Sequence, residues 1–169
     1  MELLNRMLDG SMLFDLKEAL ASATSPAFRL ASDEKIRHLQ RVPIFEECTR
    51  KQLRAVADIS KVAEVPALAV LTREGAREDE FFVIIDGTAT VKLSSRKRHR
   101  LGPGDFFGEM SLLDGEPRSA TVKAETDLRL LVINRRHFWE LLREVPELTQ
   151  RMLVTLSRRV RELEKGRNA

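Results

Sequence analysis

The sequence predicts an α+β domain: an antiparallel β-roll, similar to a jelly-roll barrel, flanked by N-terminal helices and a long C-terminal closing helix. Residues 61–133 contain short β-branched and aromatic runs separated by glycine, proline and aspartate, which is typical of strands. Apolar residues recur at helical spacing before and after this region. Successive strands with no helices between most of them form barrels or rolls rather than parallel sheets.

Composition places the chain among soluble globular proteins. Its 169 residues are enough for one domain with a short extension, and 43% are hydrophobic and 33% charged. No run approaches the roughly 20 apolar residues of a membrane-spanning helix. The start at Met1 lacks signal-peptide character and Cys48 is the one cysteine, so we expect a cytoplasmic protein without an iron–sulfur cluster held by its own thiolates. The net charge of +3 gives little reason to expect direct nucleic-acid binding.

The N-terminal part is expected to be helical. Residues 1–32 are predicted to be a helical extension and linker, because apolar residues recur at helical spacing up to residue 21 and a proline-containing break follows. A second helix is expected from Asp33 to Val42, and the run from Thr49 to Gln52 has the spacing of a capping box that opens a third. The domain itself is predicted to span residues 33–165, with a tail at 166–169.

The strand region contains one clear turn signal. The runs 81–85 and 88–93 are separated by Asp86-Gly87, which predicts a two-residue hairpin between them. The basic run 96–100 is expected to be a solvated, tight connection between two strands. Further strands are expected at 119–123, from its alternating pattern, and at 128–133, from its apolar run.

Two helices close the sequence. Asn134 is placed to cap a helix that ends at Val145, and Pro146 suits the first turn of the next helix. In this last helix one stripe is apolar over about 30 Å, which predicts that it covers apolar surface. The stripe consists of Leu148, Met152, Leu156, Val160 and Leu163.

The stretch 102–122 predicts an anion site. Gly108 lets the backbone approach a ligand closely, and the first N–H groups of a helix that begins there are unsatisfied donors. The Arg118 guanidinium can hold two phosphate oxygens through paired hydrogen bonds. Glu109 would repel a phosphate, but it can accept a hydrogen bond from a sugar hydroxyl beside it. A ligand with a phosphate and a free ribose 2′-hydroxyl therefore satisfies both residues.

From Phe107 to Val122 the chain resembles the phosphate-binding cassette of the cyclic nucleotide-binding domain family. That family includes the sensor half of the catabolite activator protein, the regulatory subunits of cyclic-AMP-dependent kinase and ligand domains of ion channels. The resemblance extends over residues 33–165 and includes Glu74-Gly75, Asp86-Gly87 and the run from Leu101 to Asp105. It implies the β-roll fold and a cyclic nucleotide as ligand.

Carried over to this chain, the resemblance assigns roles to individual residues. Gly108 and Glu109 supply backbone N–H and ribose contacts, Arg118 clamps the cyclic phosphate, and Ser119 and Ala120 add phosphate contacts. Met110 and Ser111 complete the predicted ligand-binding set, while Met110 and Leu112 are also expected to pack in the core.

Base recognition is less determined. In the activator-protein branch, hydroxyl side chains of the long helix help to read adenine, whereas the corresponding turn here is 161–164, without a hydroxyl. Leu156, Val160 and Leu163 are candidates for an apolar lid over the base, and core packing is the alternative role for each. Cyclic AMP is the expected ligand, and cyclic GMP remains open.

The predicted function is that of a cyclic nucleotide sensor that signals by repositioning its C-terminal helix. We find no nucleophile or base held by a partner and no metal-ligand spacing, so neither catalysis, a metal nor a cofactor is expected. Few residues follow Lys165, so no DNA-reading helix is expected. Residues 1–21 are the expected contact for a protein partner or a second copy of the chain. The alternatives are an interaction scaffold without ligand and a fragment of a larger transcription regulator or channel.

Overall fold

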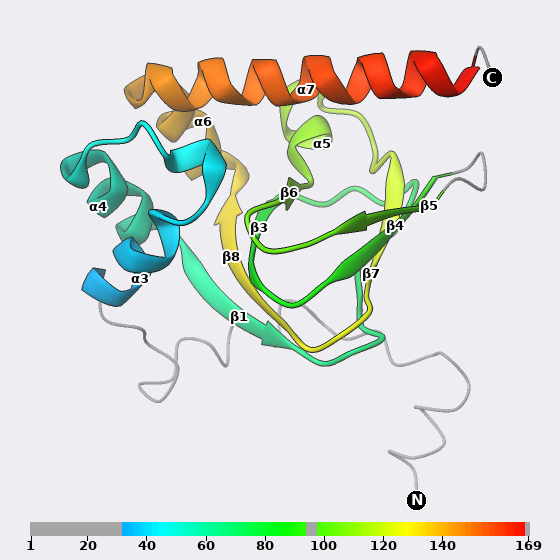
Figure 1. Ribbon diagram of the computed structural model, residues 1–169, viewed down its shortest axis with the longest axis horizontal. Helices are drawn as coiled ribbons and strands as arrows, with labels where there is room; N and C mark the ends of the chain where they lie inside the picture. Colours follow the sequence, from blue (N-terminus) through cyan, green and yellow to red (C-terminus); the bar gives the residue numbers. More distant parts are fainter. Residues whose placement is uncertain (1–31, 94–97, 168–169) are drawn as a thin grey trace, which may run out of the picture.

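The computed structural model describes residues 32–93 and 98–167 (Figure 1). The predicted N-terminal extension and its partner contact lie outside the described residues. The described helices are α3 (Ser32–Leu39), the 3-10 turn η2 (Pro43–Phe45), α4 (Arg50–Ile59), α5 (Glu109–Asp114), α6 (Arg135–Glu144) and α7 (Pro146–Arg167). The strands are β1 (Lys61–Val65), β2 (Val70–Thr72), β3 (Glu80–Asp86), β4 (Ala89–Leu93), β5 (Arg98–Leu101), β6 (Phe106–Phe107), β7 (Ala120–Ala124) and β8 (Leu128–Asn134).

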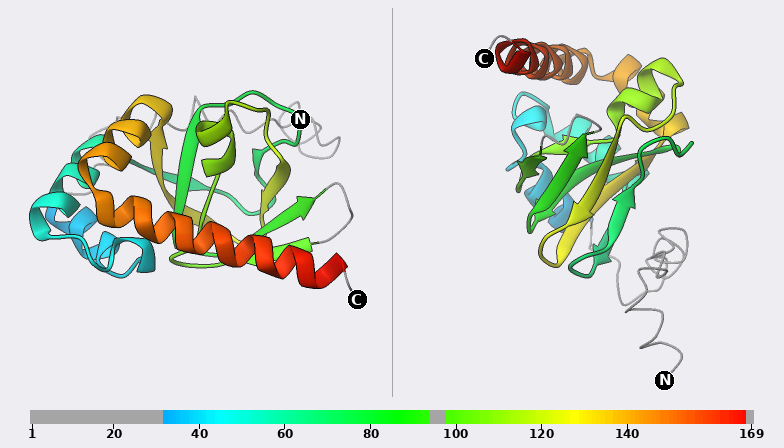
Figure 2. Two further views of the ribbon diagram at one scale, coloured as in Figure 1. Left: turned by 90° about the horizontal axis from the view of Figure 1, so that it is seen from above. Right: turned by 90° about the vertical axis from the view of Figure 1, so that its right-hand side faces the viewer.

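The strands form two four-stranded antiparallel sheets, which confirms the predicted fold class. The first sheet has the order β1-β8-β3-β6 and the second β2-β7-β4-β5. The sheets enclose one apolar interior, to which the first contributes Phe82 and Leu130 and the second Leu71 and Val122. Helices α3, α4 and α6 gather at one end of this roll, and α7 passes over α5 and α6 (Figure 1, Figure 2).

The predicted hairpin at Asp86-Gly87 is wrong. Strand β3 pairs with β6 and β8 in the first sheet, whereas β4 pairs with β5 and β7 in the second. The chain therefore leaves one sheet and enters the other at this turn. Gly87 has a φ of 91°, a left-handed conformation that allows the sharp change of direction.

The apolar run in β3 is continuous because both faces of this strand are covered. Phe81 and Val83 face the helices in one core cluster, while Phe82 and Ile84 face the interior of the roll in the other. All four side chains are buried. Strand β3 is thus packed on both faces. This packing also fixes the residues at its start, which lie next to the cassette.

The predicted starts of the helices near Thr49, Asn134 and Pro146 are confirmed, whereas the helix expected from Asp33 to Val42 already ends at Leu39. The Thr49 hydroxyl accepts a hydrogen bond from the Gln52 N–H at 3.2 Å, and the Thr49 N–H donates to Gln52 Oε1 at 2.8 Å, which completes the capping box. The Asn134 side chain caps α6, and α7 begins at Pro146.

The apolar stripe of α7 covers the core over only part of its length. Leu148 and Met152 are buried and Leu156 packs against the same cluster, whereas Val160 and Leu163 are 54% and 51% exposed. The prediction that the whole stripe covers apolar surface is therefore wrong for its C-terminal half. That half extends along the molecule beyond the helical core (Figure 1).

The basic run 96–100 is only partly a connection. Arg98, His99 and Arg100 belong to β5, where all three are exposed, and residues 96 and 97 lie outside the described residues. None of the helices within the described ranges is both long and apolar enough to cross a bilayer.

Replacing Gly87 by alanine should destabilise the fold by about 2 to 5 kcal/mol, since left-handed strain adds to steric overlap. A Cβ atom at this position would lie 2.8 Å from both Leu128 Cδ2 and Thr126 Oγ1, and closer still to the Asp127 carbonyl oxygen. The measurement is the free energy of unfolding in urea. Gly75→Ala is the matched control, because Gly75 has a φ of 83° but no atom within 4 Å of such a Cβ. An equal loss in both variants would contradict the overlap.

Candidate functional site

The predicted cassette has the expected strand, helix and strand. Strand β6 ends at Phe107, Gly108 precedes the short helix α5 with a φ of 87°, and Gly115 caps the C-terminal end of α5. Arg118 then leads into β7. Its backbone N–H donates to the Ala76 carbonyl, and its own carbonyl accepts from the Gly75 N–H, both at 2.8 Å. The loop between β2 and β3 therefore fixes the main chain of Arg118.

The Arg118 guanidinium is buried and held from three sides. Nη1 donates to the Gly108 carbonyl at 2.8 Å, Nη2 to the Glu80 carbonyl at 2.7 Å, and Nε to Glu78 Oε2 at 3.3 Å. Its side chain is only 2% exposed, and the guanidinium lies 6.0 Å from the centroid of the Phe82 ring. A second carboxylate oxygen, Glu80 Oε2, lies 3.8 Å from Nη2. A guanidinium has five N–H donors, so the three hydrogen bonds leave one N–H on each terminal nitrogen without a hydrogen bond among the described residues. Such a pair suits two oxygens of one phosphate.

Gly108 is needed because the backbone and Arg118 meet there. A Cβ atom at this position would lie 2.7 Å from the Glu80 carbonyl oxygen and 2.8 Å from Arg118 Nη1. Any side chain would therefore push the arginine away from α5. From the sequence, Gly108 is expected to let a ligand approach the backbone closely. In the structure it also makes room for Arg118.

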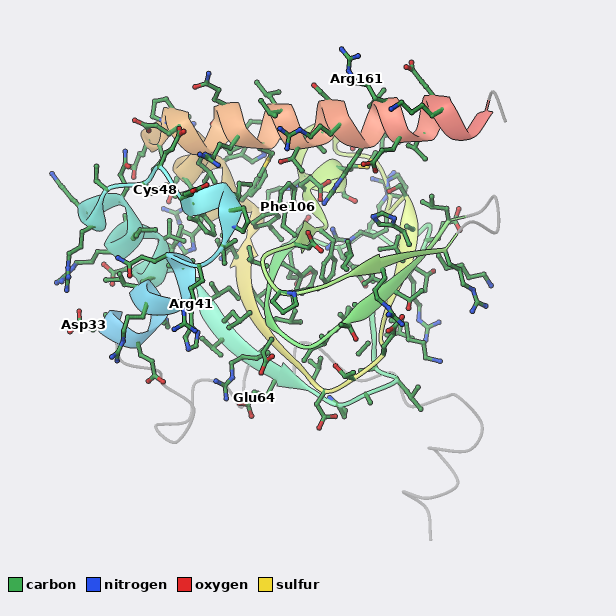
Figure 3. The ribbon with its side chains drawn as sticks, in the orientation of Figure 1. Asp33, Arg41, Cys48, Glu64, Phe106 and Arg161 are labelled. Carbon is green, nitrogen blue, oxygen red and sulfur yellow. The ribbon has the colours of Figure 1, made fainter. Side chains whose placement is uncertain are left out.

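Glu109 is buried at the first turn of α5, and its carboxylate is paired with Arg159 of α7. Arg159 Nη1 lies 2.6 Å from Glu109 Oε1, while Nη2 donates to the Phe106 carbonyl at 2.7 Å. The same guanidinium lies 4.6 Å from the centroid of the Phe106 ring, a cation–π distance. Figure 3 shows Phe106 below α7.

Burial raises the pKa of the Glu109 carboxyl above its usual value. The positive charges of Arg159 and, less strongly, Arg118 act in the opposite direction, as does a hydrogen bond from the residue's own backbone. Loss of hydration is the largest of these effects. The carboxylate is therefore kept in place at a cost to the fold, which is common for functional groups.

Helix α6 fixes the other end of α5. Arg135 Nη2 donates to the Ser111 carbonyl and Trp139 Nε1 to the Leu112 carbonyl, both at 3.0 Å. The Ser111 carbonyl also accepts from the Gly115 N–H at 3.0 Å, so it is shared between the end of α5 and α6. Helix α6 thus contacts α5 through two side chains, and α7 follows α6 directly.

The remaining predicted ligand contacts surround Arg118 and Glu109. Ser111 is buried and Ala120 is half-buried, while Ser119 is exposed with its hydroxyl 3.7 Å from Met110 Sδ. Met110 is 49% exposed, so its predicted place in the core is wrong, whereas Leu112 is buried as expected. Met110 lies on the outer side of α5, where the helix covers no further layer of the protein.

The three lid candidates are not gathered over the cassette as a set. Leu156 packs against the helical core, and Val160 and Leu163 are exposed. A lid role for the latter two requires α7 to take another position.

Sequence reasoning missed Glu78, Glu80 and Arg159 of this site. Glu78 lies in a loop without a motif, and only the fold brings it to Arg118. Arg159 left a signal, because it follows Leu156 by three residues and so falls on the core-facing side of an amphipathic helix. A charged residue in that position needs a buried partner.

Comparison with known proteins shows which of them this chain is similar to. Residues 43–145 match the family model described as the cyclic nucleotide-binding domain. A cyclic nucleotide-gated potassium channel of Mesorhizobium japonicum is 38% identical over 109 residues, which are 64% of this chain and 30% of the channel. The chain thus spans less than a third of that relative's length.

Solved structures share the fold. The structure of cAMP-bound PfPKA-R superimposes with a TM-score of 0.69 at 28% identity, over 79% of this chain and 47% of the other. The catabolite activator protein of Thermus thermophilus gives a TM-score of 0.66 at 25% identity, over 75% of this chain and 62% of the other.

The raised pKa of Glu109 predicts how stability depends on pH. A carboxyl whose pKa is higher in the folded than in the unfolded chain favours folding at low pH, and this contribution is lost as the pH rises through the folded value. Glu109→Gln should therefore gain stability relative to the natural protein as the pH rises from about 4, near the usual glutamate pKa, through the raised pKa of the folded state. Urea unfolding of both proteins across this range gives the difference.

The effect of Glu109→Gln should also be measured in a protein that carries Arg159→Met. Without the charge of Arg159 the pKa of Glu109 should rise further, so the same comparison should show a steeper dependence on pH. A difference between the glutamate and glutamine proteins that stays constant with pH would contradict the effect of burial.

Proposed function

The chain belongs to the cyclic nucleotide-binding domain family, and on this basis we propose that it binds a cyclic nucleotide, with cAMP as the preferred ligand. The predicted ligand-binding residues are Gly108, Glu109, Met110, Ser111, Arg118, Ser119 and Ala120. The name of the channel relative and the cAMP-bound state of one structural neighbour support this choice.

The observation that carries the proposal is the arrangement of Arg118. Its guanidinium is fixed against two backbone carbonyls at 2.7 and 2.8 Å, which leaves one N–H on each terminal nitrogen without a hydrogen bond among the described residues. The carboxylates of Glu78 and Glu80 lie 3.3 and 3.8 Å from the guanidinium, and a phosphate would compete with them for it. A cyclic phosphate has one negative charge and two free oxygens, which matches one guanidinium.

Glu78 adjusts the strength of this attraction. Its carboxylate lies 3.3 Å from Arg118 Nε and its side chain is 35% exposed. A bound phosphate would share the guanidinium with this carboxylate, whose exposure lets it turn toward water. The positive charge of Arg118 is therefore balanced in either state.

In this proposal, Glu109 binds the ribose of the nucleotide. A free 2′-hydroxyl can donate to the carboxylate, whereas a phosphate there would be repelled. Glu109 lies next to Gly108, whose carbonyl accepts from Arg118, so the two ligand-binding residues are joined through one peptide unit. A nucleotide whose phosphate binds Arg118 and whose ribose binds Glu109 would bridge these two residues.

We further propose that binding repositions α7, which is how the domain would signal. Contacts from α6 to the carbonyls of Ser111 and Leu112 connect the cassette to the helix before α7. Ligand that prefers one placement of α7 shifts the population toward it. Residues 33–165 would act as this sensor unit, and residues 1–21 would contact a partner or a second copy.

Thermal unfolding tests the ligand. At 100 times its dissociation constant, cAMP should stabilise the protein by about 2.7 kcal/mol, which corresponds to an increase in Tm of about 5 to 11 °C. Cyclic GMP should give a smaller increase, and linear AMP should give none. Arg118→Ala should abolish the increase, and Arg118→Lys should remove most of it because an ammonium group cannot make the paired bonds.

A second variant, Ser119→Ala, separates loss of binding from loss of folding. Ser119 is exposed, so its replacement should leave the fold intact. Removal of one phosphate contact should weaken cAMP binding by about 2- to 10-fold with the unliganded Tm unchanged. If neither cyclic nucleotide raises the Tm at millimolar concentration, the chain is an interaction scaffold that has kept the fold without the ligand.

A further inference from the structure

The outer face of the second sheet is basic. In β4, β5 and β7, every second residue, such as Ala89, Leu101 and Val122, lies in the apolar interior, so the residues between them face outward. The strand register places six outward residues in two rows across these three strands. One row is Lys123, Thr90 and Arg100, and the other is Thr121, Lys92 and Arg98. We call these six positions the basic face.

The charges of the basic face do little for the fold. Lys92, Arg98 and Lys123 are exposed, and their side chains form no hydrogen bond or ion pair with any residue that the structure describes. Lys92 lies directly opposite Arg98, and like charges in this arrangement destabilise a sheet. Charged side chains can protect an edge strand such as β5 from association, but β4 and β7 are inner strands. Edge protection therefore does not explain the two lysines.

An exposed apolar tip adjoins the basic face. It consists of Pro66, Ala67 and Leu68, which lie between β1 and β2 and are all exposed, Leu68 by 69%. The Leu68 N–H donates to the carbonyl of Ala124 at 2.9 Å, and Ala124 directly follows Lys123. The tip thus lies beside one end of β7 (Figure 1).

Leu68 holds its exposed position against backbone strain. Its φ is 72°, the one positive φ of a non-glycine residue within residues 32–93 and 98–167, and a bulky side chain disfavours this conformation. Two hydrogen bonds fix the tip, from the Ala67 N–H to Asp127 Oδ1 at 2.9 Å and from the Ala69 N–H to the Pro66 carbonyl at 3.2 Å. Strained residues fixed in this way occur preferentially at binding sites. A fixed, strained and exposed leucine therefore favours an apolar partner outside the fold.

We propose that the basic face and Leu68 together bind the surface of a membrane that contains anionic lipids. The lysine and arginine side chains lie against the negative headgroups, and Leu68 enters the boundary between headgroups and acyl chains. This function goes beyond the binding of a cyclic nucleotide. It uses none of the predicted ligand-binding residues of the cassette.

The combination of charge and apolar tip favours lipid over nucleic acid. Proteins that bind single-stranded nucleic acids stack bases on aromatic side chains, and the six positions of the basic face carry none. A bilayer, in contrast, offers both negative charge and an apolar interior for Leu68. The carboxylate of Glu125 at the border of the face is already paired with Arg100 at 3.0 Å. It therefore leaves the charges of the two lysines and Arg98 available.

Sedimentation with lipid vesicles tests the charge contribution. The full chain should bind phosphatidylcholine vesicles that contain about one third phosphatidylserine, but not phosphatidylcholine alone, and rising salt should weaken the binding. Lys92→Gln combined with Lys123→Gln should weaken it about 25-fold, since each charge contributes a factor of roughly 5. The matched control is Lys51→Gln combined with Arg158→Gln, which removes two exposed charges from α4 and α7 and should change binding less than about 2-fold.

Leu68→Gly separates membrane binding from folding. Glycine adopts a φ of 72° without strain, so the Tm should stay the same or rise, while vesicle binding should weaken about 10-fold. Leu153→Ala is the control, because it truncates a leucine that is 61% exposed on α7 and should leave vesicle binding unchanged. Full vesicle binding by Leu68→Gly would overturn the insertion of the tip.

Further outcomes would overturn the proposal as a whole. These are equal binding to vesicles with and without phosphatidylserine, and equal binding by the Lys92 and Lys123 double variant and its control. Failure to bind vesicles, together with binding of a single-stranded oligonucleotide that depends on the two lysines, would make the basic face a nucleic-acid surface instead. The vesicle assay contains no nucleotide, and the increase in Tm with cAMP should be the same in these variants as in the natural protein. Failure of either proposal is therefore distinguishable from failure of the other.

Discussion

The buried guanidinium of Arg118 is the constraint on which the rest of the site depends. A cation that is 2% exposed must be surrounded by acceptors, and these come from the start of β3, from the residue before α5 and from the β2–β3 loop. Strand β3 is in turn fixed by apolar side chains on both faces. The hydrophobic core and the charged site are therefore joined at this one strand.

Charge balance extends from Arg118 across the site to α7. Arg118 is paired with Glu78 and, at 3.8 Å, with Glu80, and Glu109 is paired with Arg159. Glu78 and Arg159 are each about one third exposed, whereas the cassette members are buried. Buried charges are costly to leave alone, whereas exposed ones are easily hydrated. The two buried charges of the cassette are therefore each paired with opposite charge from another part of the chain.

Local signals made much of the fold and part of the site predictable. The capping box at Thr49, the cap at Asn134 and the start of α7 at Pro146 depend on hydrogen bonds between residues a few positions apart. The pairing partners of β3 could not be inferred from the strand that follows it in the sequence. Asp86-Gly87 permits a reversal within one sheet and equally a passage between two sheets, and the interior packing of Phe82 and Ile84 decides between them.

The sequence alone determined the cassette, because Gly108, Glu109 and Arg118 belong to one short stretch whose residue types restrict backbone conformation and charge. Only the tertiary structure decided what these residues contact. Glu78 reaches Arg118 from 40 positions away and Arg159 reaches Glu109 from 50. Such contacts leave no fixed spacing in a sequence, since they depend on how the two sheets enclose their core and where that packing directs α7.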